Sequence, residues 1–481
     1  MKLSPLFACV PLLALAVPAR PAEDEVQLLK RQLQQMQEDF AKTRQQQQQQ
    51  IDALTRKLDE LTNRSPSAGA DKPAPAKTLE QELAAEMTAA APATPPAPAV
   101  ASAPAHAGSS YMNISYGAVM AAGWSSEADP SAQLELGDHD PIKRGFALRN
   151  AEIAVDGAVD PYFKGFANIV LKLDKDNETA IELEESFLQS TALPGNLQLK
   201  AGQYFAAFGR QNPTHPHTWS FADQSLVLAR MFGPDGLRSI GAQLSWLAPT
   251  PFYSELFVSV MDGQGGTGFS FRNPGEPDAV GVNRFAGRAT LDRTLRGAGD
   301  LLVVPRVAAS FELSDTQTVL AGLSAAFGPN DTGPHSRTEV YGADVYWKWK
   351  PADSNQGFPY LAWQTEALYR RFGAGADILA GLPAETLRDY GFYSQLVYGF
   401  MPRWNVGLRA DYVSGNAGAN DPSDPFRGER TRFSPEITFL PSEFSKVRLQ
   451  YNLDHGDLFG TANSVWMQLE FGLGAHAAHK Y

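Results

Sequence analysis

The sequence predicts an all-β transmembrane protein, a 16-stranded antiparallel outer-membrane β-barrel preceded by an α-helical coiled coil. Three observations predict it. Apolar residues recur at every second position from residue 111 onward, long and short connections alternate between these segments, and an apolar spacing of three and four residues precedes them. A period of two places one face of a strand against an apolar environment and the other against water.

The composition excludes two broad classes of protein. No stretch after the first 20 residues runs 18 apolar residues without a charge, which excludes a helical membrane protein. The net charge is −12, with 30 basic against 41 acidic groups beyond residue 110, so nucleic acid is not expected as a partner. The 41 Gly, 34 Pro and 50 aromatic residues suit a β-rich body with many turns.

Residues 1–19 are predicted to be a secretory signal peptide. Lys2 precedes an apolar run over 6–17, and the small residues Val17 and Ala19 precede the expected cut. Cys9, the only cysteine, lies inside this segment, so no thiol is expected in the mature chain. A lipoprotein box ending at Cys9 is the alternative, but cleavage there would leave too short a hydrophobic region.

Residues 20–62 are predicted to form a coiled coil. Apolar residues spaced by three and four mark its seam, with a polar gap in the middle. They are Val26, Leu29, Leu33, Met36 and Phe40, then Ile51, Leu54, Leu58 and Leu61. A lone solvated helix is the alternative, and the choice between dimer and trimer stays open. Residues 63–110 are rich in Ala, Pro and Ser and are expected to be a flexible linker.

Residues 111–481 are predicted to be the barrel. Met112, Ile114 and Tyr116 alternate with Asn113 and Ser115 in its first strand. Eight long connections are expected at 125–145, 174–180, 206–236, 262–304, 328–337, 373–389, 414–430 and 458–464. Seven tight ones are expected at 160–161, 192–195, 248–251, 314–317, 351–359, 402–404 and 441–445. Short turns at one end and long loops at the other are typical of outer-membrane barrels.

Aromatic residues near the strand ends favour a membrane-spanning barrel over a soluble β-sandwich, because barrels carry aromatic girdles at both membrane interfaces. These residues are Trp124, Trp246, Trp347, Trp349, Trp363, Tyr369, Tyr412 and Tyr451. A sandwich also has no reason to keep its long loops on one side. Two strands, 181–190 and 390–400, are apolar in both phases, and their faces are left unassigned.

Several motifs resemble the phosphate-selective porin O/P family of Gram-negative outer membranes. The motifs are Gly202-Gln203-Tyr204, Phe208-Gly209-Arg210, Arg238-Ser239-Ile240-Gly241 and the ending from Leu469 to His479. The resemblance covers residues 111–481 and extends to a leading coiled coil. It implies a passive porin, commonly trimeric, whose third long loop folds inward to narrow the pore.

In this chain that loop is 206–236, and the residues expected at the constriction are Arg210, His215, His217, Arg230 and Arg238. Guanidinium groups in a narrow passage favour phosphate and carboxylate. The alternative is a loop that lies outside as an exposed cap, with its arginines solvated.

The residues expected to line the pore carry balanced charge, which supports a porin better than it supports phosphate selectivity. The basic ones are Lys164, Lys172, Lys200, Arg306, Lys348, Lys350, Arg370, Arg409, Arg432 and Arg448. The acidic ones are Glu152, Asp156, Glu255, Glu312, Asp344, Glu366, Asp411, Glu436, Asp454 and Glu470.

Other functions are weaker predictions. A zinc-uptake porin would use the pairs His215 with His217 and His476 with His479, but no carboxylate cluster stands out beside them, so solvated histidines and no metal site are expected. No spacing typical of a hydrolase is found, so no enzyme and no cofactor are expected. Residues 20–110 leave no room for the plug domain of a 22-stranded transporter.

The partners expected are outer-membrane lipid, small and mainly anionic solutes, and two further copies in a homotrimer. The coiled coil would lie in the periplasm and could bind peptidoglycan or another envelope component. An envelope-tethering structural protein is therefore the alternative function.

Overall fold

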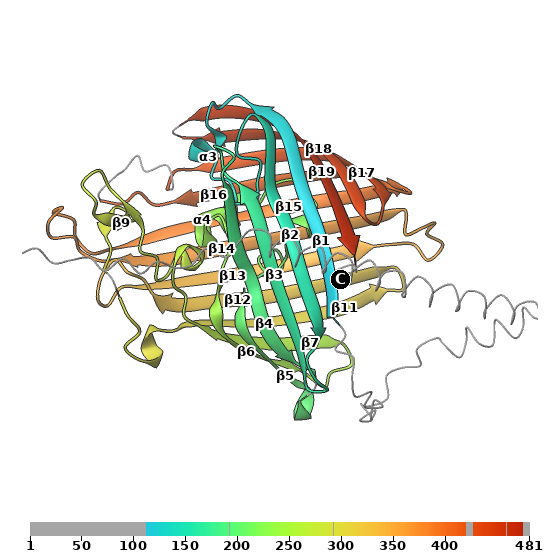
Figure 1. Ribbon diagram of the computed structural model, residues 1–481, viewed down its shortest axis with the longest axis horizontal. Coiled ribbons are helices and arrows are strands. Elements are labelled where there is room, and N and C mark those ends of the chain that lie inside the picture. The colour runs from blue at the N-terminus through green and yellow to red at the C-terminus, as the bar shows by residue number, and fades with distance from the viewer. Residues whose placement is uncertain (1–111, 192, 292, 420–426, 458, 475–481) are drawn as a thin grey trace, which may run out of the picture. The chain divides into compact units, whose positions relative to one another are not determined.

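A closed barrel of sixteen antiparallel strands is the main feature of the computed structural model (Figure 1). The structure describes residues 112–191, 193–291, 293–419, 427–457 and 459–474. The barrel prediction is confirmed. The predicted signal peptide, coiled coil and linker, together with Cys9, His476 and His479, lie outside the described residues.

The strands of the barrel follow one another around the wall in chain order. They are β1 Met112–Ser125, β2 Gly145–Ala158, β3 Phe163–Leu173, β4 Thr179–Ser190, β5 Leu197–Phe205, β6 Arg238–Leu247, β7 Tyr253–Met261, β11 Leu302–Ser314, β12 Gln317–Pro329, β13 Arg337–Trp349, β14 Tyr360–Ala374, β15 Glu385–Met401, β16 Trp404–Gly415, β17 Arg430–Ser442, β18 Ser445–Gly456 and β19 Gly460–Gly474.

The first and last strands close the barrel. Ala118 of β1 lies opposite Ala151 of β2 on one side and opposite Phe471 of β19 on the other. Closure gives every strand two hydrogen-bonded neighbours, so no edge is left with unpaired backbone groups.

Connections alternate between the two ends of the barrel. Those at one end are 159–162, 191–196, 248–252, 315–316, 350–359, 402–403 and 443–444. Those at the other end are 126–144, 174–178, 206–237, 262–301, 330–336, 375–384, 416–429 and 457–459. The predicted long loop 458–464 is wrong, because strand pairing with β18 already begins at Gly460. The second connection is shorter than predicted, because β4 begins at Thr179.

Side chains in most of the wall alternate between a polar inner face and an apolar outer face, and β18 shows the pattern. Arg448 is 2% exposed and Gln450 is fully buried, whereas the intervening Leu449 is 50% exposed. Tyr451 and Leu453 continue the exposed face. A soluble protein would bury these apolar side chains and solvate the polar ones, so the barrel has the polarity of a protein whose outer surface meets lipid.

Strand β15, one of the two whose faces were left unassigned, has an apolar outer face and a partly apolar inner face. Tyr390 and Phe392 are exposed outside, whereas Tyr393 and Val397 are buried inside. Tyr393 belongs to the same hydrophobic cluster as helix α4, Leu226–Phe232, which packs on β14, β15 and β16.

Smaller elements lie in the connections. Helix α3, Pro130–Gln133, follows β1, and the single turns are η1 Pro194–Asn196, η2 Pro216–Thr218, η3 Gly266–Gly268 and η4 Ala298–Asp300. Strands β8 Glu276–Pro277, β9 Asn283–Phe285 and β10 Arg288–Ala289 form a small separate sheet between β7 and β11. Within the described ranges, no helix has the length and apolar content needed to cross a membrane.

Candidate functional site

The connection between β5 and β6 contacts strands that are far from both of them in the wall. The backbone N–H of Gly209 donates to the Ser324 hydroxyl on β12 at 3.0 Å. The N–H groups of Arg210 and Gln211 donate to the Glu366 carboxylate on β14, at 3.1 and 2.8 Å. Backbone amides of this segment are thus satisfied by inner-face side chains rather than by water.

The middle of the segment contacts β16, β17 and β18 through Asp223. Its carboxylate accepts from Arg409 at 2.6 Å, Arg432 at 3.1 Å, Gln450 at 2.8 Å and Asn452 at 2.6 Å. Burial disfavours the charged carboxylate, but Arg409 and Arg432 outweigh burial and hold the pKa of Asp223 below its ordinary value.

Helix α4 follows, and all of its residues are buried. The N–H of Leu226 donates to Asp411 on β16 at 3.1 Å, and Arg370 on β14 donates to the carbonyl of Arg230 at 3.0 Å. Apolar contacts and hydrogen bonds therefore hold the same helix against three strands.

Two of the three arginines predicted for the constriction are buried in ion pairs. Arg230 is 2% exposed and pairs with Glu135 in the β1–β2 connection. Arg238 is 3% exposed, pairs with Glu182 on β4 and donates to the carbonyl of Glu184 at 2.8 Å. Both guanidinium charges are neutralised locally. Arg230 connects the second half of the segment to the β1–β2 connection, and Arg238, at the start of β6, connects the strand after the segment to β4.

Arg210 differs from both. Its guanidinium carbon lies 3.9 Å from the centre of the Tyr346 ring, and its Nε donates to Gln364 at 3.3 Å. In the part of the chain that the structure describes, no carboxylate forms an ion pair with it.

His215 and His217 are held by carboxylates, so the expectation of solvated loop histidines is wrong. His215 contacts Glu184 through Nδ1 at 2.8 Å and Glu185 through Nε2 at 3.0 Å. His217 Nδ1 lies 3.1 Å from Glu152. Burial disfavours protonation of His215, but the Glu184 carboxylate outweighs it and raises its pKa well above the ordinary value.

A β-bulge in β4 explains why Glu184 was missed. Asn168 of β3 lies opposite Glu185, whereas the next residue, Ile169, lies opposite Leu183. Glu184 is therefore the extra residue, and both glutamates are buried on the inner face, at 2% and 7% exposure. Strict alternation places consecutive residues on opposite faces, so only the local density of acidic residues could have pointed to this site.

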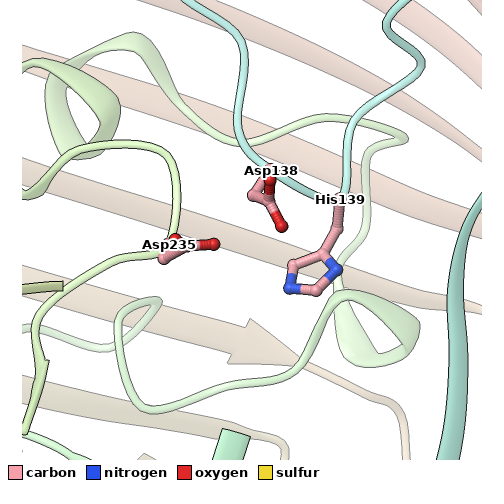
Figure 2. Close-up of side chains that lie close together, drawn as sticks. All are labelled: Asp138, His139 and Asp235. Carbon is pink, nitrogen blue, oxygen red and sulfur yellow. The ribbon is translucent and has the colours of Figure 1, made fainter. Parts of the chain in front are cut away.

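A second group of side chains adjoins the first. Asp138 and His139 come from the β1–β2 connection and Asp235 from the end of the β5–β6 segment, and Figure 2 shows them pointing toward one another. Lys172 on β3 pairs with Asp138 and with Glu182, the latter at 2.9 Å.

The pKa values of this group follow from burial and neighbouring charges. Burial disfavours the imidazolium of His139, but its hydrogen bond with Glu184 and the nearby carboxylates raise its pKa to about 9. Burial and the charge of Asp138 raise the pKa of Asp235 to about 7. His139 therefore stays protonated over the range in which Asp235 titrates.

Most of the arginines predicted to line the pore are buried and held in ion pairs. The ion pairs are Arg306 with Asp344 at 2.6 Å, Arg370 with Asp389 at 2.7 Å, Arg409 with Asp411 at 2.7 Å and Arg432 with Asp454 at 2.8 Å. Arg448 donates to Gln468 at 2.6 Å and to the carbonyl of Trp219 at 2.8 Å. Lys164 is exposed, and Lys200 and Lys348 are half-buried.

One relative among known proteins is similar enough to show the family of this chain. An uncharacterized protein of Aquifex aeolicus (strain VF5) is 31% identical over 360 residues, which are 70% of this chain and 71% of that protein. The chain belongs to the same protein family as that relative. Membership of this family assigns no activity to the chain, because the relative is itself an uncharacterized protein. No protein-family model matches the chain, so the resemblance to phosphate-selective porins stays a prediction.

The chain also resembles solved structures. The outer membrane channel DcaP of Acinetobacter baumannii matches with a TM-score of 0.50 at 11% identity, over 75% of this chain and 97% of that one. An anion-selective porin from Comamonas acidovorans matches with a TM-score of 0.47 at 8% identity, over 76% of this chain and 100% of that one. At such identities the likeness with DcaP establishes the fold alone.

Proposed function

We propose that this chain is an outer-membrane porin, a passive diffusion channel for small solutes with a weak preference for anions such as phosphate. The observation that carries the proposal is the closed barrel with a polar inner face and an apolar outer face. DcaP, which shares this fold, is an outer membrane channel.

The outer membrane is the location that suits such a surface. Exposed residues of the outer face include Ile153, Leu244, Leu323 and Leu449, all large and aliphatic. A barrel with a lipid-facing apolar band and no open edge is one of the two architectures that can span a bilayer.

Segment 206–236 is proposed as the constriction. Support comes from its hydrogen bonds to inner-face side chains on β12, β14, β16 and β18 and from the burial of α4. A segment bonded to these strands would cross the space that they enclose and would reduce the cross-section open to solutes.

The anion preference is assigned to Arg210, Lys348 and Lys350. Lys348 lies at the end of β13 and Lys350 begins the tight connection 350–359, and both Arg210 and Lys350 interact electrostatically with Lys348. Among the described residues, none of these three cations forms an ion pair. Three neighbouring unpaired cations produce a positive potential that attracts anions, and the paired arginines elsewhere keep the preference weak.

The trimer, the signal peptide and the periplasmic coiled coil stay part of the proposal. Three copies joined by a heptad seam would hold three barrels together, and an apolar seam gains little unless a partner buries it. Deleting residues 20–110 tests whether the coiled coil assembles the trimer. If trimers survive the deletion while envelope attachment is lost, the result favours the tethering function instead.

The decisive experiment is the reversal potential of the purified full-length protein in a planar bilayer under a KCl gradient. A channel with weak anion preference is expected, and Arg210→Ala should reduce that preference. Arg403→Ala is the matched control, because Arg403 is exposed in the tight connection 402–403.

Two outcomes would overturn the proposal at different levels. Cation selectivity that Arg210→Ala leaves unchanged would remove the anion assignment and keep the porin. Failure of the folded protein to conduct would remove the porin itself.

A further inference from the structure

We propose that Glu152, Glu184 and His215 form a binding site for one divalent cation of the zinc class. Ligand atoms of the three side chains all lie within 4.8 Å of one another. They come from β2, from the bulge in β4 and from the β5–β6 segment, so a bound ion would join the segment to the wall. One imidazole and two carboxylates are a donor set that zinc accepts, and three protein ligands leave a fourth position open.

The buried carboxylates of the cluster have no lysine or arginine ion pair among the described residues. Glu152, Glu184 and Glu185 are 5%, 2% and 7% exposed. Within the described part of the chain, their ion-pair partners are histidines rather than lysines or arginines. Buried carboxylates need positive charge, which either protons on the imidazoles or a metal ion must supply.

The neighbouring group of Asp138, His139 and Asp235 (Figure 2) already has such a charge. The ammonium of Lys172 pairs with Asp138 and lies 3.9 Å from Asp235. That group therefore has a lysine partner, whereas the group of Glu152, Glu184 and His215 has no lysine or arginine ion pair among the described residues, and we assign the metal site to the latter.

A buried amide beside the cluster supplies an independent indication. Asn168 is 1% exposed, and its nitrogen lies 2.7 Å from Glu184 and 3.3 Å from Nδ1 of His215. Its oxygen has no hydrogen-bond partner among the described residues. Because the two ends of an amide are nearly isosteric, a half-turn of this group would present the oxygen to a cation as a fourth ligand.

Two cavities are each lined by one of the proposed ligands. One of about 100 Å³ is lined by Glu152 and His217 and by Glu443 of the tight connection 443–444. Another of about 20 Å³ is lined by Glu184 and His139. The smaller cavity has room for about one water molecule, and the larger one leads toward the barrel end that carries the tight connections.

Zinc binding should therefore be measured on the full-length protein in detergent after dialysis against a chelator, by calorimetry with ZnCl2 alone and by elemental analysis. The expected result is one ion per chain, with Glu184→Gln and His215→Ala each weakening binding at least about tenfold. His335→Ala is the matched control, because His335 is an exposed histidine in the connection 330–336.

His215→Cys keeps the test decisive if the other variants fold poorly. A thiolate at this position retains a metal ligand, and Co²⁺ bound to it should show a sulfur-to-cobalt charge-transfer band that the unchanged protein lacks. Two outcomes would overturn the proposal. In the first, zinc binds stoichiometrically but is lost in His335→Ala and kept in His215→Ala. In the second, the protein binds no zinc and His215→Cys shows no cobalt band.

The porin proposal is tested separately. Conductance of the same chelator-treated preparation in a planar bilayer reports the channel, whatever the outcome of the zinc titration. Loss of the zinc site therefore leaves the proposed function standing, and loss of conductance leaves the zinc result interpretable.

Discussion

The carboxylate of Asp223 forms an ion pair with the guanidinium of Arg409, with 2.6 Å between Oδ1 and the arginine nitrogen. Both side chains are 1% exposed. Asp223 lies in the segment between β5 and β6, whereas Arg409 lies on β16. The pair therefore connects parts of the barrel that the wall itself keeps far apart.

Replacing Asp223 should loosen the segment. Asp223→Asn leaves Arg409 and Arg432 with one carboxylate fewer in a buried site, and breaking a buried pair costs about 3–5 kcal/mol. We expect a lower melting temperature in detergent and a larger, noisier single-channel conductance.

Asp353→Asn is the matched control, since Asp353 is exposed in the tight connection 350–359. Single-channel recordings of Asp223→Asn that match those of the control would contradict a role of this pair in the constriction.

Gly209 should tolerate no side chain. Its φ is +61°, and a Cβ there would overlap the Glu366 carboxylate, which accepts from the next two amides. Gly209→Ala therefore combines left-handed strain of about 1–2 kcal/mol with a displaced acceptor. We expect a lower melting temperature and an altered conductance, because the first turn of the segment would leave β14.

Gly299→Ala controls for a general effect of glycine replacement, because a Cβ at Gly299 meets open space. Equal melting temperatures for the two variants would show that the Glu366 contact does not hold the segment.

The sequence predicted the strands well because a membrane barrel repeats one simple rule, an apolar residue outside and a polar residue inside. It could not assign β15, because Tyr393 packs in the hydrophobic cluster that contains helix α4 rather than facing water. That helix is contributed by a segment more than one hundred residues earlier in the chain.

The charged site was harder to predict for a related reason. Arg409 and Arg432 were expected to line the pore, and they do lie on the inner face, but Asp223 covers them. Glu184 was missed because one extra residue in β4 breaks the alternation. Both features depend on pairings between distant segments, which local periodicity does not encode.

The last prediction concerns pH. The pKa of Asp235 is raised to about 7 by burial and by the charge of Asp138 and Glu182, whereas Lys172 and His139 act in the opposite direction. The folded protein thus holds a proton that the unfolded chain releases near the ordinary pKa of 3.8. Stability from this group is present below pH 3.8 and is lost as the pH rises to about 7.

Above pH 7 the segment therefore gains a negative charge. From about one unit below that pKa to about one unit above it, the reversal potential in a KCl gradient should shift toward cation preference. Asp235→Asn should abolish this shift. It should also raise the free energy of unfolding on the alkaline side by about 4 kcal/mol, since a shift from 3.8 to about 7 is about three pKa units at about 1.4 kcal/mol each. Asp140, whose pKa is raised to about 6, titrates at the acidic edge of this range, so Asp140→Asn should leave the shift in place. A shift that persists in Asp235→Asn and disappears in Asp140→Asn would contradict the prediction, because the titrating carboxylate would then be Asp140.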